Sequence, residues 1–599
     1  MVSTLQLVLV GLLAYWMAVI LAKREGLLPS YVSTQGPILL LHTQRGKEFL
    51  EWLAGPKRFW RAWANIGVGI ALVVMAGAFL FLLQGAIAII QNPPAPSAVN
   101  QPKNVLVIPG VNDFLPLSVA PEILFGLLVG LVVHEGGHGL LCRVEDIRIE
   151  SMGVGLLAIL PIAAFVEPDE EDRRKANRGG QTRMFAAGVT NNFAITLIVF
   201  ALLFGPVSGS IALASGAHVG GTLPGSSAAD ADLQFGDRVT AVDGTAVENN
   251  SHLGELLSAT DQQTVQIEVN GADTRTMERS VLVTESLQDG PTGLDIRSTI
   301  TSVNGTPVAT TNEFKRALAN SSGPVTVTAE TPDGETKTTD FVAGAYTQIQ
   351  AGGPLADAGA PEGETVIVTS IDGQRTADWE ALAAGIDDTE PGQTVPIVAY
   401  VDGQKETYQV TMGDSDGSSH LGVLGIAQGT TGLVVTDLGL QFYPSNNYLA
   451  LLGGGDQSGL NQFAQSFFGK MLLTLILPVA GVASGGAGSL PYNFAGFTGE
   501  MTNFFVVDGP LAFLGGGVFL LANLLFWTGW INVQLGFFNC IPAFPLDGGH
   551  ILRTSTEAVM SRLPIKATRG RVRLVTTTVG LTMLFSFLTL VMGPQLLAG

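Results

Sequence analysis

Long apolar runs occupy both ends of the chain, and one polar block fills its middle. A helix that crosses a membrane needs about 20 predominantly apolar residues. Stretches of this kind lie at residues 3–22, 64–90, 119–141, 184–206, 511–538 and 574–597. The first has its basic residues after the apolar run, which indicates a retained helix rather than a cleaved signal peptide. The pattern predicts a polytopic α-helical membrane protein with about six spanning helices.

Two further apolar segments do not fit a simple crossing. Residues 152–166 are too few and too interrupted by Gly and Pro for a spanning helix, which favours a hairpin or a re-entrant segment buried against protein. Residues 466–486 are apolar enough to span, but one more crossing would reverse the sidedness of everything after them. The Gly- and Pro-rich residues 479–496 favour a re-entrant or interfacial segment there.

The polar block carries the whole charge excess of the protein. Charged residues make up 14% of the chain, against about 25% in ordinary globular proteins, and the mean hydropathy is +0.36. Residues 213–420 contain 31 acidic and 9 basic side chains, a balance of −22, while the rest of the chain balances at +2. The sequence therefore predicts an acidic aqueous insert between two membrane halves. It excludes a nucleic-acid-binding protein, which would need a basic surface.

Basic residues outside the insert gather in three loops between the apolar runs, at residues 23–61, 173–183 and 562–573. Loops rich in Lys and Arg stay on the cytoplasmic side of a membrane. All three can be placed there together, which puts the N-terminus and the insert outside. We expect a multi-pass protein of the cell membrane with this orientation.

The insert repeats one pattern three times, a β-like run, a turn and a helix-like stretch. The turn glycines are Gly244, Gly305 and Gly373, each after Asp or Asn and between β-branched runs, which is a strong hairpin signal. The repeats resemble PDZ domains, which bind extended peptides by adding a strand to a sheet edge. A plain β-rich spacer is the alternative. We expect repeats at about 213–290, 291–345 and 346–420.

The third apolar run ends in the sequence HEGGH, at His134 to His138. Residues four apart on a helix share a face, so both imidazoles can reach one metal ion, and Glu135 between them is placed to take a proton from water. Buried structural histidines are the alternative. That alternative is weak within a membrane, where ionisable residues mark functional sites.

A catalytic zinc site usually has three protein ligands and one open position. The third ligand must come from another part of the helix bundle. The run NCIPAFPLDGGH, at residues 539–550, offers Asp547 and His550 near the inner end of its helix. The residues alone leave both candidates open.

HEGGH followed far downstream by NCIPAFPLDGGH resembles the site-2 protease family of intramembrane zinc metalloproteases. The resemblance implies that His134, His138 and Asp547 bind Zn²⁺ and that Glu135 is the catalytic base. Residues 187–192 also resemble a family segment on the helix packed between the two motif helices, with Val189 in place of the usual proline. The family likewise carries PDZ domains between its two halves. The activity implied is hydrolysis of peptide bonds within transmembrane segments.

Three further residues are weaker candidates for the site. Asn532 and Asn539 lie seven apart, on one helix face, and could hold a substrate backbone or an oxyanion, or else bond neighbouring helices. His550 follows Asp547 by one helical turn and could support that ligand from behind.

The expected organisation has five parts: N-terminal helices and loops at 1–118, a first core half at 119–212, the insert at 213–420, a connector at 421–510 and a second core half at 511–599. A cation transporter or channel, or a catalytically silent PDZ-type receptor, are the alternative functions. We expect the partners to be the lipid bilayer and membrane-embedded substrates already trimmed by another protease. The insert would then act as a size filter over the outer opening.

Overall fold

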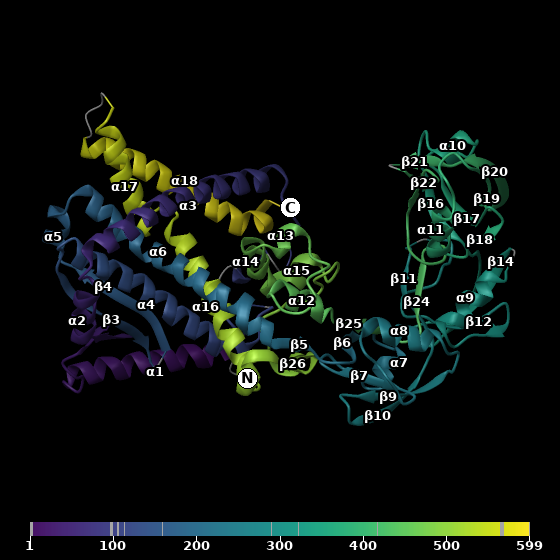
Figure 1. Cartoon of the computed structure of the whole chain (residues 1–599), viewed down its shortest axis with the longest axis horizontal. Helices are drawn as coiled ribbons and strands as arrows, with labels where there is room; N and C mark the ends of the chain where they lie inside the picture. The colour runs from purple at the N-terminus through teal and green to yellow at the C-terminus, as the bar shows by residue number, and fades with distance from the viewer. Residues whose placement is uncertain are drawn as a thin grey trace. The chain divides into compact units, whose positions relative to one another are not determined.

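A computed structural model describes residues 4–597, apart from 96, 98, 99, 105, 106, 113, 159, 289, 322, 416 and 564–567. The chain forms two compact units (Figure 1). The membrane unit comprises Met1–Ala212, Asn446–Gly499 and Val507–Gly599, and the insert comprises Leu213–Ser445 and Glu500–Val506. The membrane unit is largely helical and the insert is largely β-sheet, so the predicted fold class is confirmed.

Each expected span forms a helix. These helices are α1 (Thr4–Arg24), α3 (Lys57–Gln91), α4 (Ala120–Val144), α6 (Arg178–Leu202), α16 (Gly517–Asn539) and α18 (Arg569–Leu597). Within the described residues, six helical segments are long and apolar enough to cross a membrane: 57–91, 117–144, 178–210, 467–484, 517–539 and 569–597. The protein is a multi-pass membrane protein.

Helices α4, α6 and α16 pack closely on one another, with glycines at the points of contact. A Cβ atom added at Gly126 of α4 would lie 2.9 Å from the carbonyl oxygen of Trp527 on α16. A Cβ atom added at Gly137 of α4 would lie 2.8 Å from the carbonyl oxygen of Ala187 on α6. Small residues allow such close backbone approach inside a membrane bundle. The two motif-bearing halves are joined through this contact.

Residues 467–484 enter the bundle and turn back. They form α14 (Phe467–Ile476), a 3₁₀ turn and α15 (Ala480–Ser484). The Trp530 indole donates to the carbonyl of Leu475 at 3.0 Å, about 20 Å along α16 from its start. On the way out, Trp527 donates to Ala495 and Asn523 bonds Phe497, progressively nearer that start. These contacts trace a re-entrant path.

The three basic loops meet at one end of the membrane unit. Glu145, just after α4, accepts hydrogen bonds from Arg61 at 3.2 Å and Arg183 at 2.9 Å. Burial alone would raise the pKa of the Glu145 carboxyl, but the two guanidinium groups outweigh it and hold the pKa below its ordinary value. Arg178 faces Glu557 across 3.5 Å at the same end. Basic residues of these loops therefore form ion pairs within the membrane unit.

A four-stranded antiparallel sheet in strand order β1-β2-β3-β4 lies beside α4. Its strands are β1 (Val32–Gln35), β2 (Ile38–His42), β3 (Ile149–Leu157) and β4 (Leu160–Pro168). Strands β3 and β4 pair along their length, which confirms the hairpin predicted over 152–166. Strand β4 is an outer strand, and the amphipathic helix α2 (Gln44–Leu53) contacts β3.

The insert contains three similar antiparallel sheets, here called modules 1, 2 and 3 (Figure 1). Module 1 has β6 (Ala217–Thr222), β7 (Arg238–Val242), β9 (Thr264–Val269), β10 (Asp273–Glu278) and α8 (Asn250–Ser258). Module 2 has β11 (Val281–Ser286), β12 (Thr299–Val303), β14 (Pro324–Glu330), β15 (Thr336–Val342) and α9 (Thr311–Ala319). Module 3 has β16 (Ala345–Ile349), β17 (Thr365–Ile371), β19 (Thr394–Val401), β20 (Gln404–Thr411) and α11 (Trp379–Asp387). Each module also has a two-residue strand after its glycine turn.

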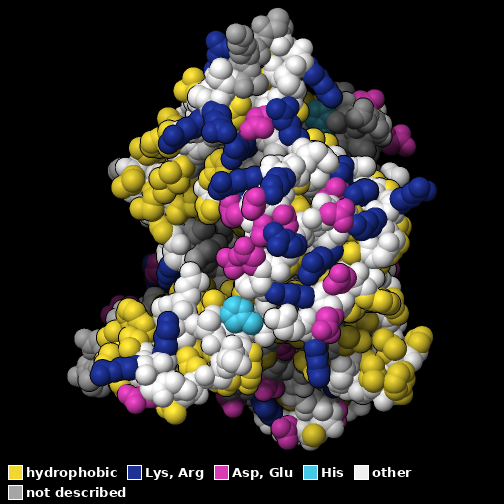
Figure 2. All heavy atoms as spheres, turned by 90° about the vertical axis from the view of Figure 1, so that its left-hand side faces the viewer, with side chains coloured by type: hydrophobic (Ala, Val, Ile, Leu, Met, Phe, Trp, Pro, Cys, Tyr) yellow, Lys and Arg dark blue, Asp and Glu magenta, His cyan; other side chains and the backbone are white. Residues whose placement is uncertain are grey.

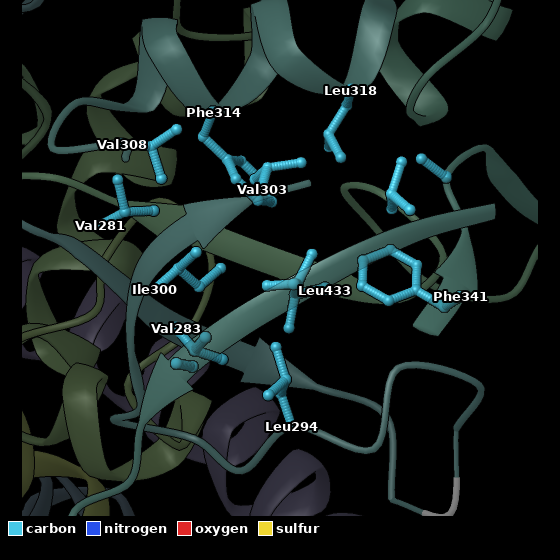
Figure 3. Packing of buried hydrophobic residues seen from close by; sticks show 14 of the residues in the cluster. Val281, Val283, Leu294, Ile300, Val303, Val308, Phe314, Leu318, Phe341 and Leu433 are labelled. Carbon is cyan, nitrogen blue, oxygen red and sulfur yellow. The ribbon is translucent and has the colours of Figure 1, made fainter. Parts of the chain in front are cut away.

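The chain then runs back through the modules in reverse order and adds one strand to each sheet. Strand β23 (Val423–Gly425) pairs with β16, β24 (Leu433–Thr436) with β11, and β25 (Leu440–Phe442) with β6. Leu433 of β24 lies inside the core of module 2, among Val283, Ile300 and Phe314 (Figure 3). We call β23, β24 and β25 the return strands.

The return strands correct two expected boundaries. The insert does not end at 420, because residues 423–442 complete its three sheets. The first repeat does not extend to 290, because β11 at 281–286 already belongs to module 2. The turn glycines mark the middle of each module, whereas the first and last strands carry no comparable signal in the sequence.

Candidate metal centre and active site

Helix α4 brings His134 and His138 together one turn apart. Their Nε2 atoms are 3.2 Å apart, and the two rings are nearly perpendicular. Both side chains are largely buried, at 9% and 14% exposure. A pair of imidazoles held this way on one helix face is the arrangement that the HEGGH spacing predicts.

Asp547 is the first residue of α17 (Asp547–Met560), and its carboxylate completes a triangle with the two histidines. Its Oδ2 atom lies 3.1 Å from His134 Nε2 and 3.2 Å from His138 Nε2. These three residues are the cluster of possible metal ligands found in the described chain. A regular tetrahedron with edges near 3.2 Å has its centre about 2.0 Å from each corner, which is the length of a zinc–nitrogen bond. The donor set fits Zn²⁺ and leaves one corner open.

A hydrogen bond fixes the tautomer of His138. Its Nδ1 atom donates to the carbonyl oxygen of Met184 on α6, at 2.8 Å. The other ring nitrogen, Nε2, is therefore free to offer its lone pair to a metal ion. The Nδ1 atom of His134 is buried and has no hydrogen-bond partner among the described residues.

Gly188 of α6 lies directly against the two imidazoles. A Cβ atom at this position would be 2.7 Å from His138 Nε2 and 2.8 Å from His134 Nδ1. Any larger residue would have to displace a ligand ring. From the sequence we assigned residues 187–192 only to helix packing. Their resemblance to a segment of the site-2 protease family was the signal that could have identified Gly188 as a neighbour of the histidines.

The carboxylate of Glu135 reaches the sheet. Its Oε2 atom accepts a hydrogen bond from the backbone N–H of Val166 on β4, at 3.0 Å. It also lines a cavity of about 820 Å³ whose other walls are almost entirely apolar. These walls come from α2, α3, α4, α6 and the sheet, and include Phe49, Trp60, Trp63, Phe165 and Ile195. A carboxylate beside two possible metal ligands thus faces an apolar groove.

The two candidate asparagines bond back to their own helix. Asn532 is fully buried, and its amide donates to the carbonyl of Thr528 at 2.8 Å. Asn539 donates in the same way to Leu535 at 3.0 Å. Neither lines the cavity beside Glu135. The structure therefore does not bring them together with Glu135 around one space.

His550 lies outside the ligand triangle. Its ring stacks on Phe185 of α6, with centroids 4.3 Å apart, and meets Phe544 edge-on at 5.0 Å. Of the two candidates for the third ligand, the structure places Asp547 with the histidines and His550 one turn further along α17. His550 instead forms part of the wall of a second cavity.

Comparison with known proteins identifies relatives of this arrangement. A model of the family described as Peptidase family M50 matches residues 122–383 and 494–587, more than half of the chain. The first segment contains His134 and His138, and the second contains Asp547.

Two relatives illustrate the range of similarity. The chain is 21% identical over 468 residues to "Putative zinc metalloprotease NMA0084" of Neisseria meningitidis, covering 73% of this chain and 91% of that protein. It is 28% identical over 176 residues to an uncharacterized protein of Methanocaldococcus jannaschii, covering 29% of this chain and 45% of that protein. The chain thus spans nearly all of the first relative and less than half of the second.

Proposed function

The chain belongs to peptidase family M50 and is a membrane metalloprotease that uses Zn²⁺, and we propose that it hydrolyses peptide bonds within transmembrane segments of other membrane proteins. One observation carries this proposal. The triangle of His134, His138 and Asp547 is formed by a helix long and apolar enough to span the membrane and by the helix that follows another such span. A peptide bond that reaches this site must therefore come from within or close to the membrane.

The positions of these side chains support the following catalytic roles. His134, His138 and Asp547 would hold the Zn²⁺ ion, which would supply Lewis acidity for the scissile carbonyl and for the attacking water. Glu135 takes the proton of the attacking water and later delivers it to the leaving amine. The N–H of Val166 holds the Glu135 carboxylate in place. Met184 orients the ring of His138.

A helical substrate hides its peptide bonds in its own hydrogen bonds, so it must unwind before cleavage. The outer edge of β4 offers backbone groups with which an unwound segment can pair. The cavity beside it has apolar walls, which suit the side chains of a membrane segment. We propose that the substrate lies along β4 with its side chains in this cavity.

The insert is proposed to lie outside the cell, with the catalytic residues nearer the cytoplasmic side. It would act as a size filter that admits membrane proteins already trimmed by another protease. The return strands favour steric selection over capture of peptide ends, because they already pair with the first strand of each module. The three sheets thus use their own chain where a PDZ-like domain would add a peptide.

Cleavage of a model single-pass substrate in proteoliposomes tests the proposed activity. We expect the wild-type protein to cleave it and Glu135→Gln to lose about 10³-fold in rate while keeping its zinc, because only the base is removed. His134→Ala should lose both zinc and cleavage. A protein that moves cations across the vesicle membrane but leaves the substrate intact would instead be a transporter that uses the same residues.

A deletion tests the size filter separately. Because the return strands belong to the insert, the deletion must run from 214 to 444 rather than end at 420. We expect the shortened protein to keep its zinc and to cleave substrates with bulky outer domains, which the full chain rejects. Unchanged selectivity for trimmed substrates would contradict the filter and leave the proposed proteolysis standing.

A further inference from the structure

The membrane unit has a second cavity, of about 710 Å³, between α5 (Glu170–Lys175), α6, α17 and α18. It lies where two candidate spans begin, at Arg178 and Arg569, and hence at the boundary of the apolar region. Its charged lining consists of Arg173, Arg174, Arg178, Arg553, Arg569, Glu170 and Glu557. We call this cavity the arginine pocket. The function proposed above assigns it no role.

The arginine pocket has more positive than negative charge. Five guanidinium groups face two carboxylates, which leaves an excess of +3. Glu170 pairs with Arg173 and with Arg174, and Glu557 lies 3.5 Å from Arg178 and 3.4 Å from Arg553. Arg569 has no ion pair within the described part of the chain. Like charges gathered around one hollow repel one another unless an anion enters it.

The face that carries α5 and α17 has many basic side chains, with acidic ones among them and apolar surface at its flanks (Figure 2). Within this mixed surface, every basic residue that lines the pocket is an arginine. The guanidinium group is planar and donates paired hydrogen bonds, which match the oxygens of a phosphate group. Basic pockets between membrane helices on the cytoplasmic side bind the headgroups of acidic lipids.

We propose that the arginine pocket binds a phosphate group, supplied at this depth by the headgroup of an anionic phospholipid. Free phosphate shares the same chemistry and is the alternative source. The guanidinium groups of Arg553 and Arg569 approach from α17 and α18, and those of Arg173 and Arg178 from α5 and α6. A bound phosphodiester headgroup carries one negative charge and would offset about a third of the excess of +3.

The pocket also joins the two halves of the protease core. Helices α5 and α6 precede the insert in the sequence, and α17 and α18 follow it. A hydrogen bond of 2.9 Å between Thr182 and Thr554 already links the two halves beside the pocket. Phe185 in the pocket wall follows Met184, which orients His138, and stacks on His550, one turn after Asp547. An anion in the pocket would therefore stabilise the packing that holds the ligand triangle together.

The test uses the full chain in nanodiscs of phosphatidylcholine, with and without phosphatidylglycerol, and follows its thermal unfolding. We expect the acidic lipid to raise the Tm of the wild-type protein by about 3 °C. The shift should vanish in the double variant Arg553→Gln/Arg569→Gln. The matched control Arg562→Gln/Arg573→Gln removes the same charge from exposed positions outside the pocket and should keep the shift.

Two further arms identify the source and guard against misfolding. Inorganic phosphate added to phosphatidylcholine nanodiscs should leave the Tm unchanged, and a shift that the double variant abolishes would assign the pocket to free phosphate. If the glutamine variant fails to fold, Arg553→Lys/Arg569→Lys keeps the charge, and native mass spectrometry should count fewer retained phosphatidylglycerol molecules on it than on the wild type. The proposal would be overturned if phosphatidylglycerol raised the Tm of the wild type and of the double variant equally. It would also be overturned if phosphatidylglycerol left the Tm of the wild type unchanged.

Discussion

The two units of this protein treat the edges of their sheets in opposite ways. In the membrane unit, β4 pairs with β3 on one side only, and the described chain places no strand on its other side. That open side meets Glu135 and an apolar cavity. In the insert, the first strand of every module has its outer side covered by a return strand.

An unpaired strand edge is a liability, because its backbone groups pair readily with other chains. In the insert, the strand that ends each sheet beside the first strand of a module is only three or four residues long, and a short edge strand offers few backbone groups to another chain. The membrane unit leaves the outer edge of β4 open beside Glu135, the proposed base. The two units therefore differ in the edge that they offer: β4 is a nine-residue strand with one open side, whereas strands of three or four residues lie beside the first strand of each module.

The way the return strands are held supports this interpretation. In each module the returning chain also contacts the start of the helix. Tyr443 accepts from Asn250 of α8, Asp437 from the N–H of Thr311 of α9, and Gly429 from the N–H of Trp379 of α11. The returning chain is therefore bonded both to the first strand and to the start of the helix in all three modules.

The largest effect is expected where the closed insert depends on a buried ion pair. Arg279, between modules 1 and 2 on the outward path, is 2% exposed and bonds Asp437 on the return path. Asp437→Asn leaves this guanidinium without its counter-charge, which costs about 3–5 kcal/mol. We expect faster hydrogen exchange in modules 1 and 2, with zinc content unchanged. The exposed pair of Lys315 and Glu380 gives the control. Lys315→Gln should change the free energy of opening, measured by hydrogen exchange, by less than about 1 kcal/mol.

The open edge is tested next. Val166→Pro removes the N–H that holds Glu135 and blocks part of the outer edge of β4, whose ladder to β3 can survive a proline at an edge position. We expect cleavage to fall about 100-fold, or about 2.7 kcal/mol, with zinc retained. Val166→Ala keeps the N–H and should retain most of the activity. If both variants were equally impaired, the side chain rather than the edge would be responsible.

The histidine pair of the candidate site could be predicted from sequence because its geometry is local. HEGGH sets two imidazoles on one helix face by spacing alone, and the apolar runs mark the helices around it. The choice of Asp547 over His550 needed either the family resemblance or the structure, since both lie within one turn of α17. The close approach of Gly188 could not be read from its neighbours, because it depends on how α6 packs against α4.

The return strands could not be predicted from the sequence, for a different reason. They are three or four residues long and pair with strands up to about two hundred residues away, so no periodicity identifies them. The arginine pocket could not be predicted from the sequence for a related reason. Four of its five arginines were recognised as parts of the basic loops, but only the packing of α17 against α6 and α18 brings them together with Arg553 in one pocket.

The smallest effect is expected where a return strand is displaced without damage to a core. Leu424 of β23 is the register partner of Gln348 on β16, and its side chain is 52% exposed. Leu424→Pro removes one backbone donor and no buried side chain, so module 3 should lose only about 1 kcal/mol of stability.

The same variant loosens β23, so the backbone groups of β16 that β23 covers become available for pairing with a peptide. We expect extended peptides to bind this variant weakly and the wild-type protein not at all, measured by fluorescence anisotropy of a labelled apolar peptide. Leu424→Ala keeps the donor and serves as the control. Equal peptide binding by the wild-type protein would mean that the insert captures substrates at another edge, and the contrast with β4 would fail.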